Sequence, residues 1–133
     1  MKQCNIIFYF ILLITISFAC KKSSSGTKDT TAPVVTFTTP TANGFYASGD
    51  TVYVRGSITD DNSLASTSVE IKNKTTSAVL FQQTNSTGSV PVYSFLWKWK
   101  NNVGVLTPAS VKVVATDASG NQNIATVDIS LDH

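Results

Sequence analysis

Alternation of apolar and polar residues is the feature that most constrains the fold of this chain. Between Ala32 and Leu131 apolar side chains repeatedly occupy every second position, and no window of about 11 residues carries a clear helical period. In the stretch 51–59, for example, one face would carry Val52, Val54 and Ile58. Such alternation is typical of strands with one buried face, so we predict an all-β domain.

Turn-forming residues separate the alternating stretches at intervals of about 8 to 12 residues. About seven short strands in a domain of about 100 residues favour a two-layer antiparallel β-sandwich. The expected strands are 34–38, 51–59, 66–72, 79–82, 90–100, 110–116 and 123–131.

Two segments carry a resemblance to a known family. Residues 49–61 (GDTVYVRGSITDD) and 113–121 (VVATDASGN) are similar to bacterial immunoglobulin-like domains of secreted and lipid-anchored proteins. The resemblance covers nearly all of residues 32–131 and implies an antiparallel immunoglobulin-like β-sandwich of about seven strands. The Cys…Trp…Cys centre of antibody domains is absent from this stretch, so the resemblance is not to those domains.

An apolar run from Ile6 to Ala19 precedes the domain and follows a short polar start that carries one charge, Lys2. This run is shorter than the roughly 20 apolar residues of a membrane-spanning helix. Its length fits the apolar part of a secretory signal, which takes about 7 to 15 residues. We therefore interpret residues 1–19 as a signal peptide.

The sequence Ser17-Phe18-Ala19-Cys20 resembles the lipobox of bacterial lipoproteins. The resemblance implies diacylglyceryl transfer to the Cys20 sulfur, cleavage after Ala19, and acylation of the new amino terminus with a fatty acid such as palmitate. It also implies a lipid-anchored protein of the cell envelope. Lys21 stands where the best-known inner-membrane sorting rule has Asp, which favours the outer membrane on either face. The alternative is an uncleaved N-terminal anchor.

Residues 20–31 form the next segment, which is rich in Ser, Thr and Lys. After Cys20 it has no apolar side chain to bury, so we predict a flexible linker. The expected organisation is a signal peptide (1–19), a lipidated Cys20 with its linker (20–31), and an immunoglobulin-like domain (32–133). We expect the domain to be a monomer.

No catalytic constellation is recognisable in the sequence. The sole histidine, His133, is the last residue, so a Ser-His or Cys-His pair around it is not expected. There is no glycine-rich phosphate loop, His-x-x-x-His or Cys-x-x-Cys pattern. A formal net charge of +2 without a basic cluster argues against nucleic acid as a partner. We predict a protein that is not an enzyme.

Oxygen-bearing side chains gather in the loops 60–63 and 117–121, which emerge at the same end of an immunoglobulin-like sandwich. Ca²⁺ takes about six to eight oxygen ligands, which such loops could supply. The competing interpretation is turn chemistry, because Asp and Asn side chains bond to the backbone of their own turns. It is favoured because the spacing matches no specific calcium loop. The candidate Ca²⁺ ligands are Asp60, Asp61, Asn62, Asp117 and Asn121.

The stretch 90–100 is the most aromatic of the chain. Its alternating rings fit a core, because aromatic side chains bury about 150–250 Å² each. This interpretation suits Tyr93, Phe95 and Trp97. We expect Trp99, near the strand end, to be exposed, where it would form a sugar-stacking or docking site together with Lys98 and Lys100.

These features lead to one main functional hypothesis, a non-catalytic, lipid-anchored module of the cell envelope for adhesion, scaffolding or ligand binding. The alternative is a glycan-binding accessory lipoprotein of a polysaccharide-capture system. The expected partners are the membrane, through the anchor, and a glycan or an envelope protein. A third class, an inhibitor, needs a protruding loop, and only the connection 101–108 is long enough to suggest one.

Overall fold

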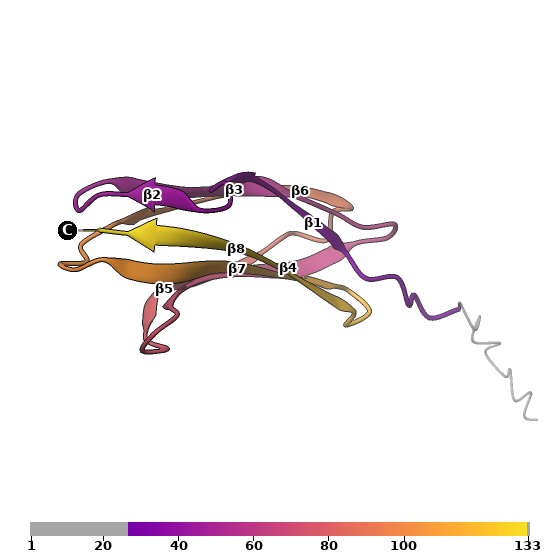
Figure 1. Ribbon diagram of the computed structural model, residues 1–133. Helices are drawn as coiled ribbons and strands as arrows, with labels where there is room; N and C mark the ends of the chain where they lie inside the picture. The colour runs from indigo at the N-terminus through magenta and orange to yellow at the C-terminus, as the bar shows by residue number, and fades with distance from the viewer. Residues whose placement is uncertain (1–26, 133) are drawn as a thin grey trace, which may run out of the picture.

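A computed structural model describes residues 27–132, and these residues form eight β-strands in two layers (Figure 1). The fold class predicted from the alternation is confirmed. Residues 1–26 and 133, which include the predicted signal peptide and Cys20, lie outside the described residues. Within 27–132, no helix has the length and apolar character needed to cross a membrane. The strands are β1 (Val34–Thr39), β2 (Gly44–Tyr46), β3 (Thr51–Thr59), β4 (Leu64–Asn73), β5 (Val79–Ser86), β6 (Val92–Lys100), β7 (Thr107–Asp117) and β8 (Gln122–Leu131).

The two layers are a three-stranded sheet in the order β1-β3-β6 and a five-stranded sheet in the order β2-β8-β7-β4-β5. Neighbouring strands are antiparallel except for β2, which pairs in parallel with the end of β8. β2 is the strand that the sequence did not predict, because it is three residues long and lies between two turns. The chain enters the sandwich at one end, and β8 finishes at the other (Figure 1).

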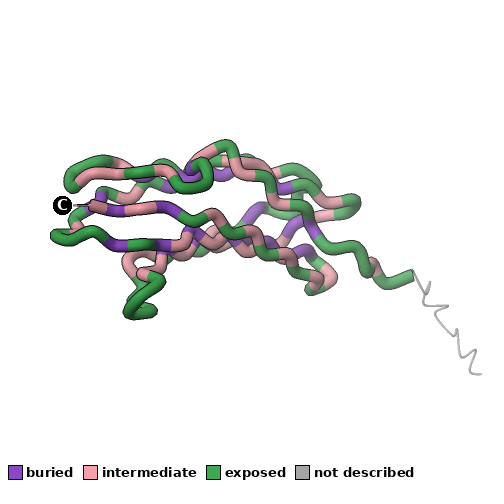
Figure 2. The backbone as a smooth tube through the Cα atoms, viewed as in Figure 1, coloured by how far each residue is buried: buried purple, intermediate pink, exposed green. Residues whose placement is uncertain are grey.

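The core lies between the two sheets and follows the alternation of the sequence. Figure 2 shows buried and exposed residues alternating along the strands. In β7, Val111, Val113 and Ala115 are completely buried, as their predicted common face requires. The buried apolar side chains are Val52, Val54, Ile58, Leu64, Val69, Ile71, Phe95, Trp97, Ala109, Val111, Val113, Ala115, Ile129 and Leu131.

An aromatic cluster fills the core beside Gly56. Phe95 packs edge-on against Phe37, with ring centroids 6.1 Å apart, and stacks on Trp97 at 5.0 Å. A Cβ atom at Gly56 would overlap the carbonyl oxygen of Thr36 and press on the Phe95 ring. The close approach of β1 and Phe95 therefore requires a glycine at this position.

A buried amide, Asn101, closes the end of the sandwich at which β8 finishes. Its Nδ2 donates hydrogen bonds to the carbonyl oxygens of Tyr46 and Asp132, both at 3.1 Å. Its Oδ1 accepts the backbone N–H of Val103 at 3.0 Å. Asn101 is 1% exposed, so three well-placed partners satisfy a side chain that water barely reaches. The sequence predicts a connecting loop at Asn101 and does not reveal this role.

Candidate functional site

Two loops and the segment that precedes β1 meet at the end of the sandwich opposite to Asn101 (Figure 1). This segment, residues 27–33, is called the entering chain or entering segment below. The loop 60–63 joins β3 to β4, and the turn 117–121 joins β7 to β8. The N–H of Ala118 donates to the carbonyl oxygen of Ser63 at 2.8 Å, so the loop and the turn lie side by side. The segment before β1 runs along the same end of the molecule (Figure 1).

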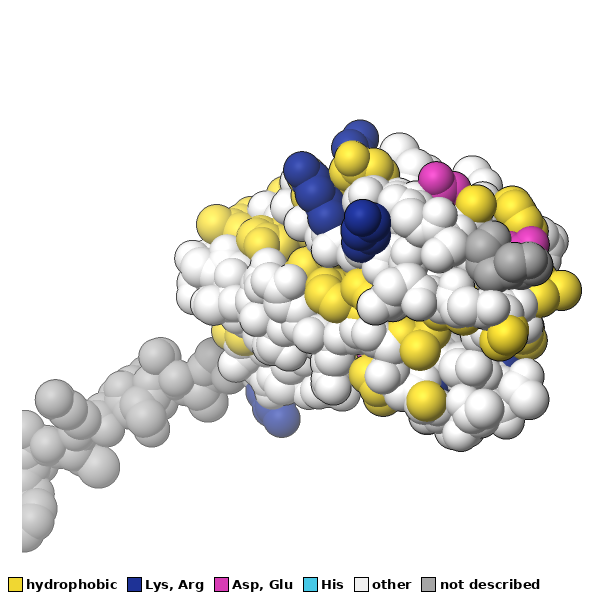
Figure 3. Space-filling model, turned by 90° about the vertical axis from the view of Figure 1, so that its left-hand side faces the viewer, with side chains coloured by type: hydrophobic (Ala, Val, Ile, Leu, Met, Phe, Trp, Pro, Cys, Tyr) yellow, Lys and Arg dark blue, Asp and Glu magenta, His cyan; other side chains and the backbone are white. Residues whose placement is uncertain are grey.

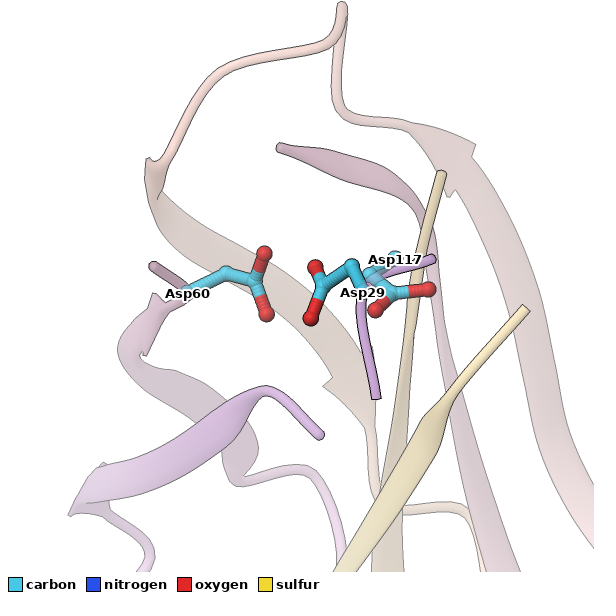
Figure 4. A group of neighbouring side chains, drawn as sticks. All are labelled: Asp29, Asp60 and Asp117. Carbon is cyan, nitrogen blue, oxygen red and sulfur yellow. The ribbon is translucent and has the colours of Figure 1, made fainter. Parts of the chain in front are cut away.

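Three carboxylates converge where these segments meet (Figure 4). One oxygen atom from each of Asp29, Asp60 and Asp117 lies within 4.8 Å of the other two. Asp29 belongs to the entering segment, Asp60 follows β3, and Asp117 ends β7. In Figure 4 the carboxylates of Asp60 and Asp29 point toward one another, and Asp117 lies next to Asp29.

One oxygen of each carboxylate bonds to the backbone of its own turn. In Asp29 and Asp60 the Oδ1 atom accepts the N–H group two residues further along, at 2.9 and 3.1 Å. The Oδ1 atom of Asp117 accepts the N–H groups of Ser119 and Asn121 at 2.9 and 2.7 Å. Turn chemistry therefore explains the position of these three oxygens.

The second oxygens of Asp29 and Asp60 have no such explanation. Each Oδ2 atom exposes less than 1 Å² and accepts no hydrogen bond from the described residues. At a separation of 4.8 Å, two unit negative charges repel by roughly 1 kcal/mol at the dielectric constant of water and by roughly 3 kcal/mol when the effective constant is about 20. Buried charges in proteins are normally paired or bound to a metal ion. The two Oδ2 atoms therefore indicate a place for a cation.

Asp117 is buried but fully hydrogen-bonded. Burial raises its pKa, whereas the hydrogen bonds from Asn121, Ser119 and Gly120 lower it by more, so the pKa of Asp117 lies below its ordinary value. The strongest of these contacts is the side-chain amide of Asn121, whose Nδ2 donates to Asp117 Oδ2 at 2.7 Å. The hydrogen bonds therefore hold Asp117 as a carboxylate beside the other two.

Two asparagines hold the entering chain against the β7–β8 hairpin. Nδ2 of Asn121 donates to the carbonyl oxygens of Asp29 and Thr31, both at 3.1 Å. Nδ2 of Asn123 donates to the carbonyl oxygen of Pro33 at 2.7 Å. Hydrogen bonds from Asn121 thus connect the C-terminal end of the predicted linker to the domain. The pattern of apolar residues in the sequence does not reveal these hydrogen bonds.

The structure brings only two of the five predicted calcium ligands into the converging group. It brings Asp60 and Asp117 together, and it turns the amide nitrogen of Asn121 toward carbonyl and carboxylate oxygens. Asp61 and Asn62 are exposed and lie outside the converging group. Asp29 was missed, because nothing in its spacing places it near residues far along the chain.

The three residues of the predicted sugar-stacking site lie on opposite faces of β6. Trp99 is half-buried and packs against the core, opposite Val52 of β3. The expectation of an exposed Trp99 is therefore wrong, because the sandwich encloses more of the aromatic strand than was expected. Lys98 and Lys100 are exposed on the outer face.

An exposed tyrosine accompanies these lysines. Tyr53 of β3 lies opposite Lys98 and is 38% exposed. The Arg55 guanidinium carbon lies 4.7 Å from the centroid of the Tyr53 ring, and Nζ of Lys98 lies 5.8 Å from it. Both distances are within the range of cation–π attraction. We name this surface the basic face; its residues are Tyr53, Arg55, Leu96, Lys98 and Lys100.

The basic face lies on the half of the three-stranded sheet that is remote from the entering chain. Figure 3 shows Lys and Arg side chains gathered with hydrophobic ones along its upper edge, the side of the three-stranded sheet. The strands β1, β3 and β6 contain three basic residues and no acidic one. None of the ion pairs formed by the described residues involves the basic face.

Comparisons with known proteins reveal a likeness of fold. No family model matches the chain, and no curated protein matches it. The fibronectin(III)-like modules of Clostridium thermocellum CbhA match with 16% identity and a TM-score of 0.53, over 76% of this chain and 47% of that chain. CopC from Methylosinus trichosporium OB3b matches with 12% identity and a TM-score of 0.47, over 74% of this chain and 94% of that one. Superoxide reductase (neelaredoxin) from Ignicoccus hospitalis matches with 11% identity and a TM-score of 0.49, over 77% of this chain and 81% of that one.

The match to the CbhA modules supports the assignment of the fold. The chain is a β-sandwich of the immunoglobulin-like and fibronectin(III)-like kind, and it spans 47% of the CbhA structure that it matches. At 16% identity the likeness carries no information on ligands or partners. Function must therefore be argued from the two surface sites.

Proposed function

We propose that this protein is a non-catalytic, lipid-anchored module of the bacterial cell envelope that binds an anionic partner through the basic face. The basic face is the observation that carries the proposal, because it concentrates Arg55, Lys98 and Lys100 around one exposed tyrosine. It lies away from the entering chain, so a protein moored through Cys20 would present it away from the anchor.

The contrast with the opposite sheet supports this choice of surface. On the five-stranded sheet, Lys112 pairs with Glu70 at 2.8 Å, and Lys74 pairs with Asp128. The basic face has no such internal partners among the described residues, so its charges are available to an external anion. Positive charges gathered on one surface also speed the encounter with a negatively charged partner.

Tyr53 orders the basic face for binding. Its ring attracts both Arg55 and Lys98, which holds two like-charged side chains close together. Such preorganisation lowers the entropic cost of ordering these side chains around a ligand. The guanidinium group can also grip a carboxylate or sulfate through two parallel hydrogen bonds.

If the anionic partner is an acidic polysaccharide, the protein is also the glycan-binding accessory lipoprotein that the sequence offered as the alternative. A glycan array with acidic and neutral polysaccharides tests it. We expect wild type to bind the acidic set, and the double variant Arg55→Gln/Lys98→Gln to bind at least about tenfold more weakly. The matched control is Lys112→Gln on the opposite sheet, which should bind like wild type. Undetectable binding of acidic glycans by wild type would reject the glycan form of the proposal.

The lipid anchor has its own test, because Cys20 lies outside the described residues. Mass spectrometry of membranes from expressing bacteria should find the mature N-terminus at Cys20 with a diacylglyceryl group and an acyl chain. Several chains, at about 0.8 kcal/mol for each buried CH₂ group, hold a protein firmly in a bilayer. A Cys20→Ser variant should lose the modification. Release of unmodified wild-type protein into the medium would refute the anchor.

A further inference from the structure

We propose that Asp29, Asp60 and Asp117 form a Ca²⁺ site that fastens the entering chain to the end of the sandwich. This site differs from the one predicted from the sequence, because a residue of the linker replaces Asp61 and Asn62. It is also independent of the basic face, which lies toward the opposite end of the three-stranded sheet.

Two separate observations point to a bound cation. The first is the convergence of three carboxylates within 4.8 Å of one another. The second is that the Oδ2 atoms of Asp29 and Asp60 are buried and accept no hydrogen bond from the described residues, in two carboxylates that face one another (Figure 4). The turn bonds occupy only the Oδ1 atoms of these two residues, so turn chemistry leaves the second observation unexplained.

The chemistry of the donors selects the class of metal. Carboxylate oxygens are hard ligands that suit Ca²⁺ and Mg²⁺, and no Cys or His belongs to this group. Ca²⁺ binds oxygen at about 2.3–2.6 Å, so two of its ligands can lie up to about 5 Å apart. Mg²⁺ binds at about 2.0–2.1 Å and limits that separation to about 4 Å. Ca²⁺ therefore fits the observed spacing with less movement, and water would complete its shell.

The position of Asp29 gives the site its role. Asp60 and Asp117 belong to loops of the folded domain, whereas Asp29 precedes β1. An ion bound to all three adds a link between the entering segment and both loops. It would strengthen the polar contacts that Asn121 already makes with the carbonyl oxygens of Asp29 and Thr31.

Thermal unfolding of the full-length protein in detergent micelles tests binding, with tryptophan fluorescence as the signal. Extracellular calcium modules bind with Kd values of about 0.1–1 mM. At a Kd of about 1 mM, CaCl₂ at about 10 mM should raise the Tm by roughly 6–11 °C relative to EDTA. NaCl at the same ionic strength is the control for charge screening, and it should produce only a small part of this rise in Tm.

Matched variants locate the ion. Asp29→Asn and Asp60→Asn should lose the calcium-dependent shift, whereas Asp61→Asn, the exposed neighbour of Asp60, should keep it. The proposal is overturned if wild type shows no shift, or if Asp29→Asn and Asp60→Asn respond to calcium like wild type. An equal shift with MgCl₂ would overturn the choice of calcium.

Limited proteolysis tests the role of the linker. The protease Lys-C cleaves after lysine and needs no calcium, and Lys28 is exposed next to Asp29. Calcium should slow cleavage after Lys28 by about tenfold in wild type and leave it unchanged in Asp60→Asn. If calcium raises the Tm but the cleavage rate does not change, the ion binds without fastening the linker, and that part of the proposal fails.

Discussion

The two ends of this sandwich solve the same problem in different ways. Each end brings together polar groups from distant parts of the chain and buries some of their atoms. At one end a neutral amide, Asn101, meets two acceptors and one donor and leaves no polar atom without a partner. At the other end Asp29, Asp60 and Asp117 converge, and two of their oxygens accept no hydrogen bond.

The comparison separates a structural polar cluster from a candidate binding site. Burial and long-range contacts are common to both ends, so neither property identifies function. What differs is whether the protein itself satisfies the buried groups. The buried amide of Asn101 is satisfied without a ligand, whereas the end that holds Asp60 would gain stability from the cation that we propose.

The largest expected effect comes from giving the neutral end a charge. Asn101→Asp would replace the Nδ2 donor by an oxygen that faces the carbonyl oxygens of Tyr46 and Asp132. We expect a loss of about 3–5 kcal/mol in the free energy of unfolding, since a buried charge would be left without a partner. Urea denaturation measures it, with the exposed neighbour Asn102→Asp as the control. A loss below about 1 kcal/mol would contradict the assigned role of Asn101.

The next effect concerns the amide that serves the charged end. Asn121→Ala removes the two N–H hydrogens that bond to the carbonyl oxygens of Asp29 and Thr31 and to Asp117 Oδ2. At a net value of about 0.5–1.5 kcal/mol for each hydrogen bond, we expect a loss of about 1–3 kcal/mol. The variant should also be cleaved faster by Lys-C after Lys28. Unchanged cleavage would show that Asn121 does not hold the entering segment.

A smaller effect of opposite sign is expected at Asp60. In the presence of EDTA, Asp60→Asn removes one of the converging negative charges and keeps an oxygen for the N–H of Asn62. The free energy of unfolding should rise by about 1 kcal/mol. Asp61→Asn should change it by less than about 0.5 kcal/mol, because Asp61 is exposed. Destabilisation by Asp60→Asn in EDTA would remove the contrast between the two ends.

The smallest effect is a dependence on pH. The folded-state pKa of Asp117 lies below its ordinary value of 3.8, mainly because hydrogen bonds from Asn121 outweigh burial. A carboxyl group with a lowered pKa contributes stability above its unfolded pKa and loses that contribution as the pH falls through the folded pKa. In EDTA, wild-type stability should therefore fall below about pH 4, and Asp117→Asn should fall less steeply. Urea midpoints between about pH 5 and pH 2 would show parallel curves if this account were wrong.

The strand faces could be predicted from the sequence because alternation reports burial directly. In β3, the side chains at alternate positions point to the same face, and this face packs against the core. The buried residues on it are Val52, Val54 and Ile58. Trp99 also occupies a position whose side chain points toward the core. The wrong expectation was that the end of the strand would be exposed to solvent. The loops that carry Asp60 and Asp117 could also be placed together, because the order of strands in such a sandwich sets which loops are neighbours.

The polar interactions at both ends could not be predicted in the same way. Asn101 is buried because of contacts with Tyr46 and Asp132, which lie far away in the sequence. Asp29 joins the carboxylate group through hydrogen bonds from Asn121, also far along the chain. No local pattern reports such contacts, since a lone Asp or Asn in a loop looks the same whether it is solvated or bonded.

The segment before β1 and the end of β8 lie at opposite ends of the sandwich, and this arrangement has a mechanical consequence. A pull between the entering segment and the end of β8 acts along the strands, and the hydrogen bonds between antiparallel strands lie across that direction. Tension would therefore load the ladders β1–β3 and β7–β8 in shear, with many bonds resisting at once, instead of unzipping them one by one. A module built in this way resists unfolding when a force pulls its two ends apart.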